Sequence, residues 1–156
     1  MLVSNVNNTK EFMALLLKKD TFDGFQVREV IITTFTTFEI HCNLNKDFFE
    51  TEEEITRKFC LWSELKPHVF ELIKGNRLPK SIKIVFSADD TLLHSISPEA
   101  SALFINVNFE NNRLGIITGL SLKNFTLNKT VEFMWDEWVI NFLEGNKITI
   151  SAAEEE

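Results

Sequence analysis

The side chains best placed for acid–base chemistry are Glu39 and His41, which lie two residues apart in a segment of alternating apolar and polar residues. Residues at i and i+2 project from the same face of a strand. A carboxylate beside an imidazole is a common arrangement for moving a proton. The plainer interpretation is two polar residues on the solvated face of a half-exposed sheet. Glu39 and His41 are therefore catalytic candidates that compete with this interpretation.

A second candidate is a cluster of cations without an intervening acid, which we call the basic turn: Lys74, Arg77, Lys80 and Lys83. In a chain with a net charge of −7, such a cluster could bind a small anion or an acidic partner. The alternative is that cations close a helix, where they complement the helix dipole, and then continue along a solvated strand.

The sequence does not support other catalytic or metal-binding patterns. The glycines are isolated, so they form no phosphate-binding loop. His41, His68 and His94 are far apart, and Cys42 would point to the opposite sheet face from His41, which argues against a zinc site. Cys60 and His68 lack a spacing that would bring a nucleophile to a base. We predict no metal and no cofactor.

Composition limits the partners and the compartment. The chain has 156 residues, of which 44% are hydrophobic and 25% charged, as in ordinary globular proteins. Its acidity disfavours extended nucleic acid, which requires many clustered cations. The polar first nine residues predict no signal peptide, and the longest apolar run, residues 12–17, is too short for a membrane helix. With Cys42 and Cys60 read as buried free thiols, we predict a cytoplasmic protein.

Local patterns predict the elements that must position these residues. Asn8 with Glu11, and Thr51 with Glu54, have the form of capping boxes. Helices are expected over residues 9–19, 52–61, 64–74 and 131–143, with a short helix between Asp89 and Pro98. Strands are expected over residues 26–33, 36–45, 81–87, 103–109, 114–118 and 122–127, with an edge strand near 147–151.

These elements predict an α+β fold with a largely antiparallel, curved sheet of five to seven strands packed by three to four helices. The pair Asn111–Asn112 predicts a tight hairpin turn, because Asn tolerates the left-handed conformation. The length fits one globular domain over residues 1–151, followed by a frayed acidic tail over 152–156.

The predicted terminal helix is apolar on two sides. Its broad core face is expected to comprise Val131, Met134, Trp135, Trp138 and Phe142. Phe133 and Ile140 form a second stripe among acidic residues. That stripe is either covered by the same domain or presented to a partner, which would be a second copy in a homodimer or another protein.

Short blocks across the chain carry a resemblance: ITTF at 32–35, NKDF at 45–48, WSELKP at 62–67, ELIKG at 71–75 followed by Pro79, and WDE at 135–137. The sequence resembles a small family of uncharacterised proteins from Gram-positive bacteria, classed as a domain of unknown function. The resemblance implies a cytoplasmic single-domain protein and supplies no catalytic residue.

The leading hypothesis is therefore a non-catalytic cytoplasmic binding or regulatory module, with Phe133 and Ile140 as the candidate surface for self-association. The alternative is a small enzyme acting on a phosphorylated or otherwise anionic metabolite, with His41 and Glu39 as the acid–base pair.

Overall fold

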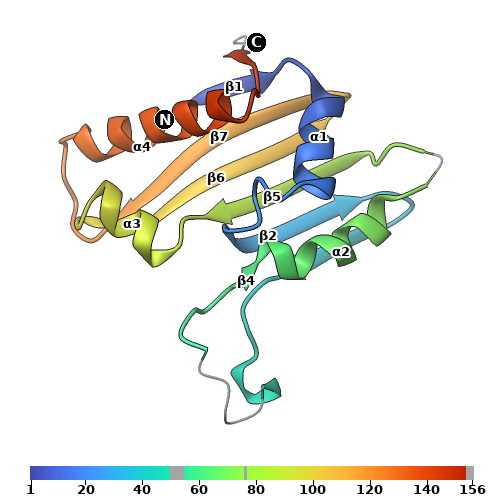
Figure 1. Ribbon diagram of the computed structural model, residues 1–156, viewed down its shortest axis with the longest axis horizontal. Coiled ribbons are helices and arrows are strands. Elements are labelled where there is room, and N and C mark those ends of the chain that lie inside the picture. The colour runs from blue at the N-terminus through green and yellow to red at the C-terminus, as the bar shows by residue number, and fades with distance from the viewer. Residues whose placement is uncertain (50–54, 76, 154–156) are drawn as a thin grey trace.

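The computed structural model describes residues 1–49, 55–75 and 77–153, which form a curved antiparallel sheet with helices packed against it (Figure 1). The described strands are β1 (Val3–Val6), β2 (Gln26–Thr33), β3 (Thr37–His41), β4 (Cys60–Leu61), β5 (Ser81–Ser87), β6 (Ala100–Glu110), β7 (Arg113–Leu122) and β8 (Ile150–Ala152). Their order is β3-β2-β5-β6-β7-β1-β8, and β4 pairs with β2. The α+β prediction is confirmed, with eight strands rather than five to seven.

The helices are α1 (Thr9–Lys18), α2 (Trp62–Ile73), α3 (Asp90–Ile96) and α4 (Thr130–Gly145). In Figure 1, α1, α2 and α4 lie across the same face of the sheet. A single 3-10 turn (Lys46–Phe48) lies on the extension that leaves the sheet after β3. Among the described helices, none is long and apolar enough to cross a membrane.

Alternation along the central strands separates the covered face of the sheet from its open face. In β5, Ile82, Ile84 and Phe86 are buried against the helices, whereas Lys83 is exposed. The long β6–β7 hairpin turns at Asn111 and Asn112, whose φ angles are 53° and 59°. Positive φ at both central residues is the geometry of a two-residue hairpin turn, and Asn adopts it readily. The prediction for this turn is confirmed.

Large aromatic side chains fill the core between sheet and helices. Phe22 is fully buried, stacks on Phe86 with ring centroids 5.2 Å apart, and meets Phe142 edge to face. Trp62 is also fully buried, and its Nε1–H donates to the carbonyl of Leu16 at 2.8 Å. This bond joins the start of α2 to the last turns of α1.

The prediction of a helix over residues 52–61 is wrong for its described part, residues 55–61. Residues 55–58 are irregular, Phe59 bridges to Asn43, and Cys60–Leu61 form β4. Thr51 and Glu54 lie outside the described residues. Pairing with β2 provides backbone hydrogen-bond partners for this segment, which the helical pattern could not anticipate.

Several element boundaries also differ from prediction. α2 starts two residues before the predicted position, and the Glu64 carboxylate accepts from the backbone N–H of Leu61 at 2.8 Å. β3 ends at His41 rather than residue 45, and β7 continues to Leu122, after which no strand occurs over residues 123–127. β1 was not predicted at all, and β8 ends at Ala152, inside the segment predicted to be frayed; residues 154–156 lie outside the description.

The buried stripe of α4 is rotated relative to the predicted one. Val131, Trp135, Val139 and Leu143 are buried, whereas Met134 is 42% exposed. These four positions recur every four residues and face the sheet as one ridge. Trp138 and Phe142 lie beside this ridge, half-buried and stacked with centroids 5.2 Å apart.

Candidate functional site

The structure places Glu39 and His41 on β3, an edge strand of the sheet, with both side chains exposed. They share a face, and His41 is registered opposite Glu29 on β2. Neither residue lines any of the cavities described below. Their assignment as an acid–base pair stays a prediction.

The structure divides the basic turn between different surfaces. Lys74 follows α2 and pairs with Glu71 at 2.7 Å, whereas Lys83 projects from the open face of the sheet, 3.7 Å from Glu29. Lys80 and Arg77 are exposed in the connection between α2 and β5. The joint role of these four cations stays a prediction. Lys74 borders a cavity of about 590 Å³.

That cavity is a groove between α1 and α2. Lys66 of α2 bonds to the carbonyl of Lys19 and to Asp23, and Trp62 bonds to the carbonyl of Leu16, so the C-terminal end of α1 is tied to the first half of α2. The other ends of the two helices, near Lys10 and Lys74, line a hollow of about 590 Å³. We call this hollow the α1–α2 groove.

The α1–α2 groove is lined almost entirely by apolar side chains. Its walls come from both helices and from the connection that follows α2: Met13, Leu17, Phe70, Ile73, Leu78 and Pro79. Ile82 of β5 and Phe109 of β6 form part of the lining and are 4% and 7% exposed. Leu78, in contrast, is 75% exposed. The volume lies within the range of about 300–1,000 Å³ common for small-molecule sites.

Polar and basic residues form a smaller part of the groove lining. Lys10 and Lys74 line the groove, as do Thr9 and Asn112. The latter two also line an adjoining hollow of about 420 Å³, which Arg113 borders. The arrangement can hold an apolar body in the groove while an anionic group lies near Lys10 or in the adjoining hollow.

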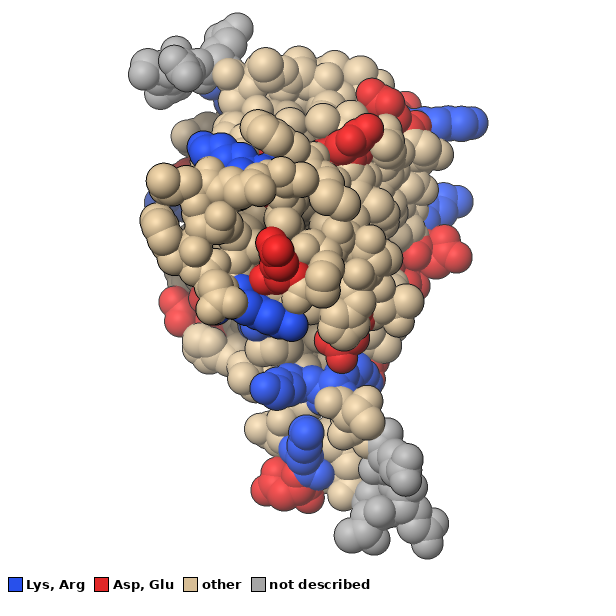
Figure 2. Space-filling model, turned by 90° about the vertical axis from the view of Figure 1, so that its left-hand side faces the viewer, with Lys and Arg blue, Asp and Glu red and all other residues tan. Residues whose placement is uncertain are grey.

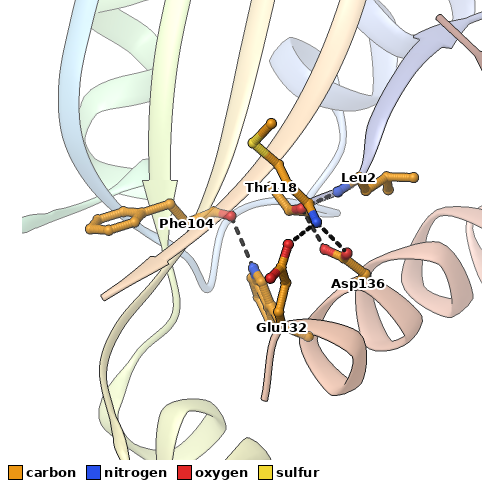
Figure 3. Close-up of polar contacts among 7 residues, drawn as sticks. Leu2, Phe104, Thr118, Glu132 and Asp136 are labelled. Atoms are coloured by element: carbon orange, nitrogen blue, oxygen red, sulfur yellow. Dashed lines mark hydrogen bonds and ion pairs between the residues drawn. The ribbon is translucent and has the colours of Figure 1, made fainter. Parts of the chain in front are cut away.

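A separate polar cluster joins α4 to the sheet, as Figure 3 shows. The hydroxyl of Thr118, on β7, donates to Asp136 Oδ1 at 2.5 Å and accepts from the N–H of Leu2 at 2.8 Å. The amino group of Met1 pairs with Glu132 and lies 3.2 Å from Asp136 Oδ2. Its hydrogen bond to Glu132 raises the pKa of the amine and lowers the pKa of the Glu132 carboxyl. Thr118 is buried and bonded on both sides, which fits a structural role.

We expect Thr118→Val to lower the free energy of unfolding by about 1–3 kcal/mol, because the Leu2 N–H and the Asp136 carboxylate each lose a partner. Urea denaturation of both proteins measures the difference. Thr126→Val is the control, since the Thr126 hydroxyl accepts one local bond at an exposed site. Equal losses in both variants would contradict a special role for Thr118.

Among the described residues, no three His, Cys, Asp or Glu side chains gather as metal ligands. His68 and His94 are exposed on α2 and α3. Cys42 is buried, as predicted, whereas Cys60 is only half-buried. Phe133 is 65% exposed on α4 and Ile140 is half-buried, so their role as an interface stays a prediction.

Residues 15–151 match a family model described as Family of unknown function (DUF5721). The chain belongs to this family. The predicted resemblance to a domain of unknown function is thereby confirmed. The stretch matched by DUF5721 begins inside α1 and includes α2, β5 and β6, which supply much of the α1–α2 groove. No curated protein and no solved structure matches the chain.

Proposed function

We propose that the protein is a non-catalytic binding module that holds the apolar body of an anionic amphiphile, such as a medium-chain carboxylate, in the α1–α2 groove. The observation that carries this proposal is the apolar lining of a hollow of about 590 Å³ that Lys10 and Lys74 also border. Transferring an apolar chain from water to such a surface is favourable by about 25 cal/mol per Å² buried.

Charge complementarity favours an anionic head group over a neutral one. Lys10 makes no ion pair within the described part of the chain, and Arg113 borders the adjoining hollow. The only acidic partner described for Lys74 is Glu71, at an exposed site where an ion pair contributes little. A carboxylate ligand can therefore approach Lys10 and Lys74 without displacing an ion pair that is buried in the described part of the chain.

A cytoplasmic location fits the free thiols of Cys42 and Cys60, because reducing compartments keep such thiols unpaired. Self-association through Phe133 and Ile140 belongs to the same proposal. Its support is the exposed apolar surface near the start of α4, where Phe133 and Met134 are 65% and 42% exposed.

Replacing Leu78 by Ser is expected to weaken decanoate binding about fivefold, because a side chain that would be covered by the ligand loses roughly 1 kcal/mol of burial. Leu78 is 75% exposed without ligand, so the substitution should leave the fold intact. Isothermal titration with decanoate measures the change. Leu127→Ser removes a leucine that is 85% exposed on another surface and serves as the matched control.

The charge preference is tested with Lys10→Glu. This variant should bind decanoate several-fold more weakly while binding 1-decanol as the unaltered protein does, because only the carboxylate interacts with the Lys10 charge. Lys18→Glu, on the same helix but outside the groove lining, is the control. Absence of decanoate binding, or equal effects of Leu78→Ser and Leu127→Ser, would refute the proposed function.

A further inference from the structure

A second cavity has Arg28 in its lining and is more polar than the α1–α2 groove. It has a volume of about 210 Å³, and its described lining includes three cations, Arg28, Arg57 and Lys58, but one carboxylate, Asp90. Neutral polar residues, including Gln26 and Ser101, complete much of its lining. In a chain with a net charge of −7, this excess of cations sets the cavity apart.

Arg28 is held in a fixed orientation. Its guanidinium lies 3.9 Å from the ring centroid of Phe59 and 5.3 Å from that of Phe104. Its Nε–H donates to the buried Ser87 Oγ at 3.1 Å. The aromatic rings and the hydroxyl position the planar group, and the Nη donors face no carboxylate within ion-pair distance among the described residues.

The backbone explains how Arg28 comes to occupy this place. A bulge interrupts the β2–β5 register between Val27 and Glu29, so Arg28 has no partner in that ladder. On its other edge, β2 pairs with β4 at Gln26 and Val27 and with β3 from Glu29 onward, so the strand partner also changes at Arg28. β-Bulges redirect side chains in this way and are frequent beside binding sites.

The remaining cations differ in how far they are neutralised. The guanidinium of Arg57 donates two hydrogen bonds, of 2.7 and 2.8 Å, to the carboxylate of Glu64. Lys58 is exposed, and its amino group makes no hydrogen bond or ion pair with the described residues. Lys and Arg side chains gather where the body of the molecule meets its narrow lower extension, on the side shown in Figure 2.

We propose that this cavity binds the phosphate group of a small phosphate monoester or of inorganic phosphate, with Arg28 donating from its Nη atoms and Lys58 supplying the second charge. Two cations that have no carboxylate partner among residues 1–49, 55–75 and 77–153 match a phosphate dianion, and guanidinium groups bind phosphate oxygens bidentately. Burial lowers the pKa of Arg28, so a bound anion would compensate a desolvated charge. The small volume favours a compact anion over a nucleic-acid backbone.

Isothermal titration with inorganic phosphate and with glycerol 3-phosphate tests this proposal, with sodium chloride at matched ionic strength and glycerol as blanks. Lys58→Gln should weaken binding about threefold, as expected for one exposed charge. Arg28→Lys should weaken it by about tenfold or more, because the charge stays while bidentate donation is lost. Lys46→Gln alters an exposed lysine on the same extension, outside the cavity, and should change nothing.

Backbone amide shifts on titration should be largest at Arg28, Ser87 and Ser101. Tighter binding of glycerol 3-phosphate than of phosphate identifies an ester as the ligand, and equal binding identifies the free ion; both support the site. Lack of binding by both, shifts that cluster elsewhere, or unchanged affinity in Lys58→Gln and Arg28→Lys would overturn it. If Arg28→Lys fails to fold, the phosphate affinities of Lys58→Gln and Lys46→Gln are compared instead. Equal affinities in these two variants would overturn the proposal. These experiments do not use decanoate, so their outcome tests the phosphate site independently of the proposed function of the α1–α2 groove.

Discussion

Replacing Trp62 by Ala is expected to lower the free energy of unfolding by about 4 kcal/mol, near the upper end for single core substitutions. The Trp62 side chain is fully buried at the start of α2, and its ring meets Phe86 edge to face with centroids 5.3 Å apart. Truncation removes this contact, leaves a cavity, and deprives the buried Leu16 carbonyl of its indole donor.

Trp62→Phe separates packing from hydrogen bonding. It retains an aromatic ring but cannot donate to Leu16, so we expect a loss of about 1–3 kcal/mol, well below that of Trp62→Ala. Urea denaturation followed by circular dichroism gives both values if the slope with denaturant stays constant. A loss below about 1 kcal/mol for Trp62→Ala would show that the α1–α2 junction tolerates a cavity.

Elements defined by local chemistry could be predicted from the sequence. Asn8 accepts from the N–H of Glu11 at 3.0 Å, as the capping pattern indicated, and α1 begins at the next residue, Thr9. The Asn111–Asn112 turn was predictable for the same reason, since the conformation it requires is a property of those residues themselves. Each of these signals lies within a few residues of the structure that it predicts.

Elements defined by distant pairing could not be predicted in this way. β1 is short and is stabilised by pairing with β7 and β8 from the other end of the chain. In the segment predicted as a helix, Glu53 stands four residues before Arg57 in the sequence, which is the spacing of a helical ion pair. In the structure Arg57 binds Glu64 at the start of α2. Pairing of Cys60 and Leu61 with β2 thus prevailed over a helical pattern worth only a few tenths of a kcal/mol per ion pair.

The two proposed sites follow the same distinction. Lys74 was a sequence candidate, but the apolar groove beside it combines α1, α2, β5 and β6, and no single periodic pattern identifies that combination. Arg28 gave no signal because it sits in a predicted strand, where an alternating residue is expected to face solvent. Only the bulge and the distant Phe59 and Phe104 rings turn it into a positioned donor.

Above pH 9 the protein is expected to lose stability through the thiol of Cys42. Burial, followed by the nearby Cys60 and Glu29, raises the pKa of Cys42 from an ordinary value of 9.0 to about 12. Between these values the folded protein retains a proton that the unfolded chain releases, so the free energy of unfolding falls as pH rises. Below pH 9 both states hold the proton, and Cys42 contributes no pH dependence.

The slope due to Cys42 should approach 1.4 kcal/mol per pH unit, so the unaltered protein should lose about 1.4 kcal/mol more than Cys42→Val between pH 8 and pH 10. Valine is apolar and cannot ionise, which isolates the titration from the packing. Urea denaturation under reducing conditions at both pH values measures this difference. Cys60→Val, at a half-buried thiol whose pKa is also raised, should retain most of the slope. Equal alkaline losses in the unaltered protein and Cys42→Val would assign the effect to other groups, because the burial of Cys42 would then carry no penalty for its thiolate.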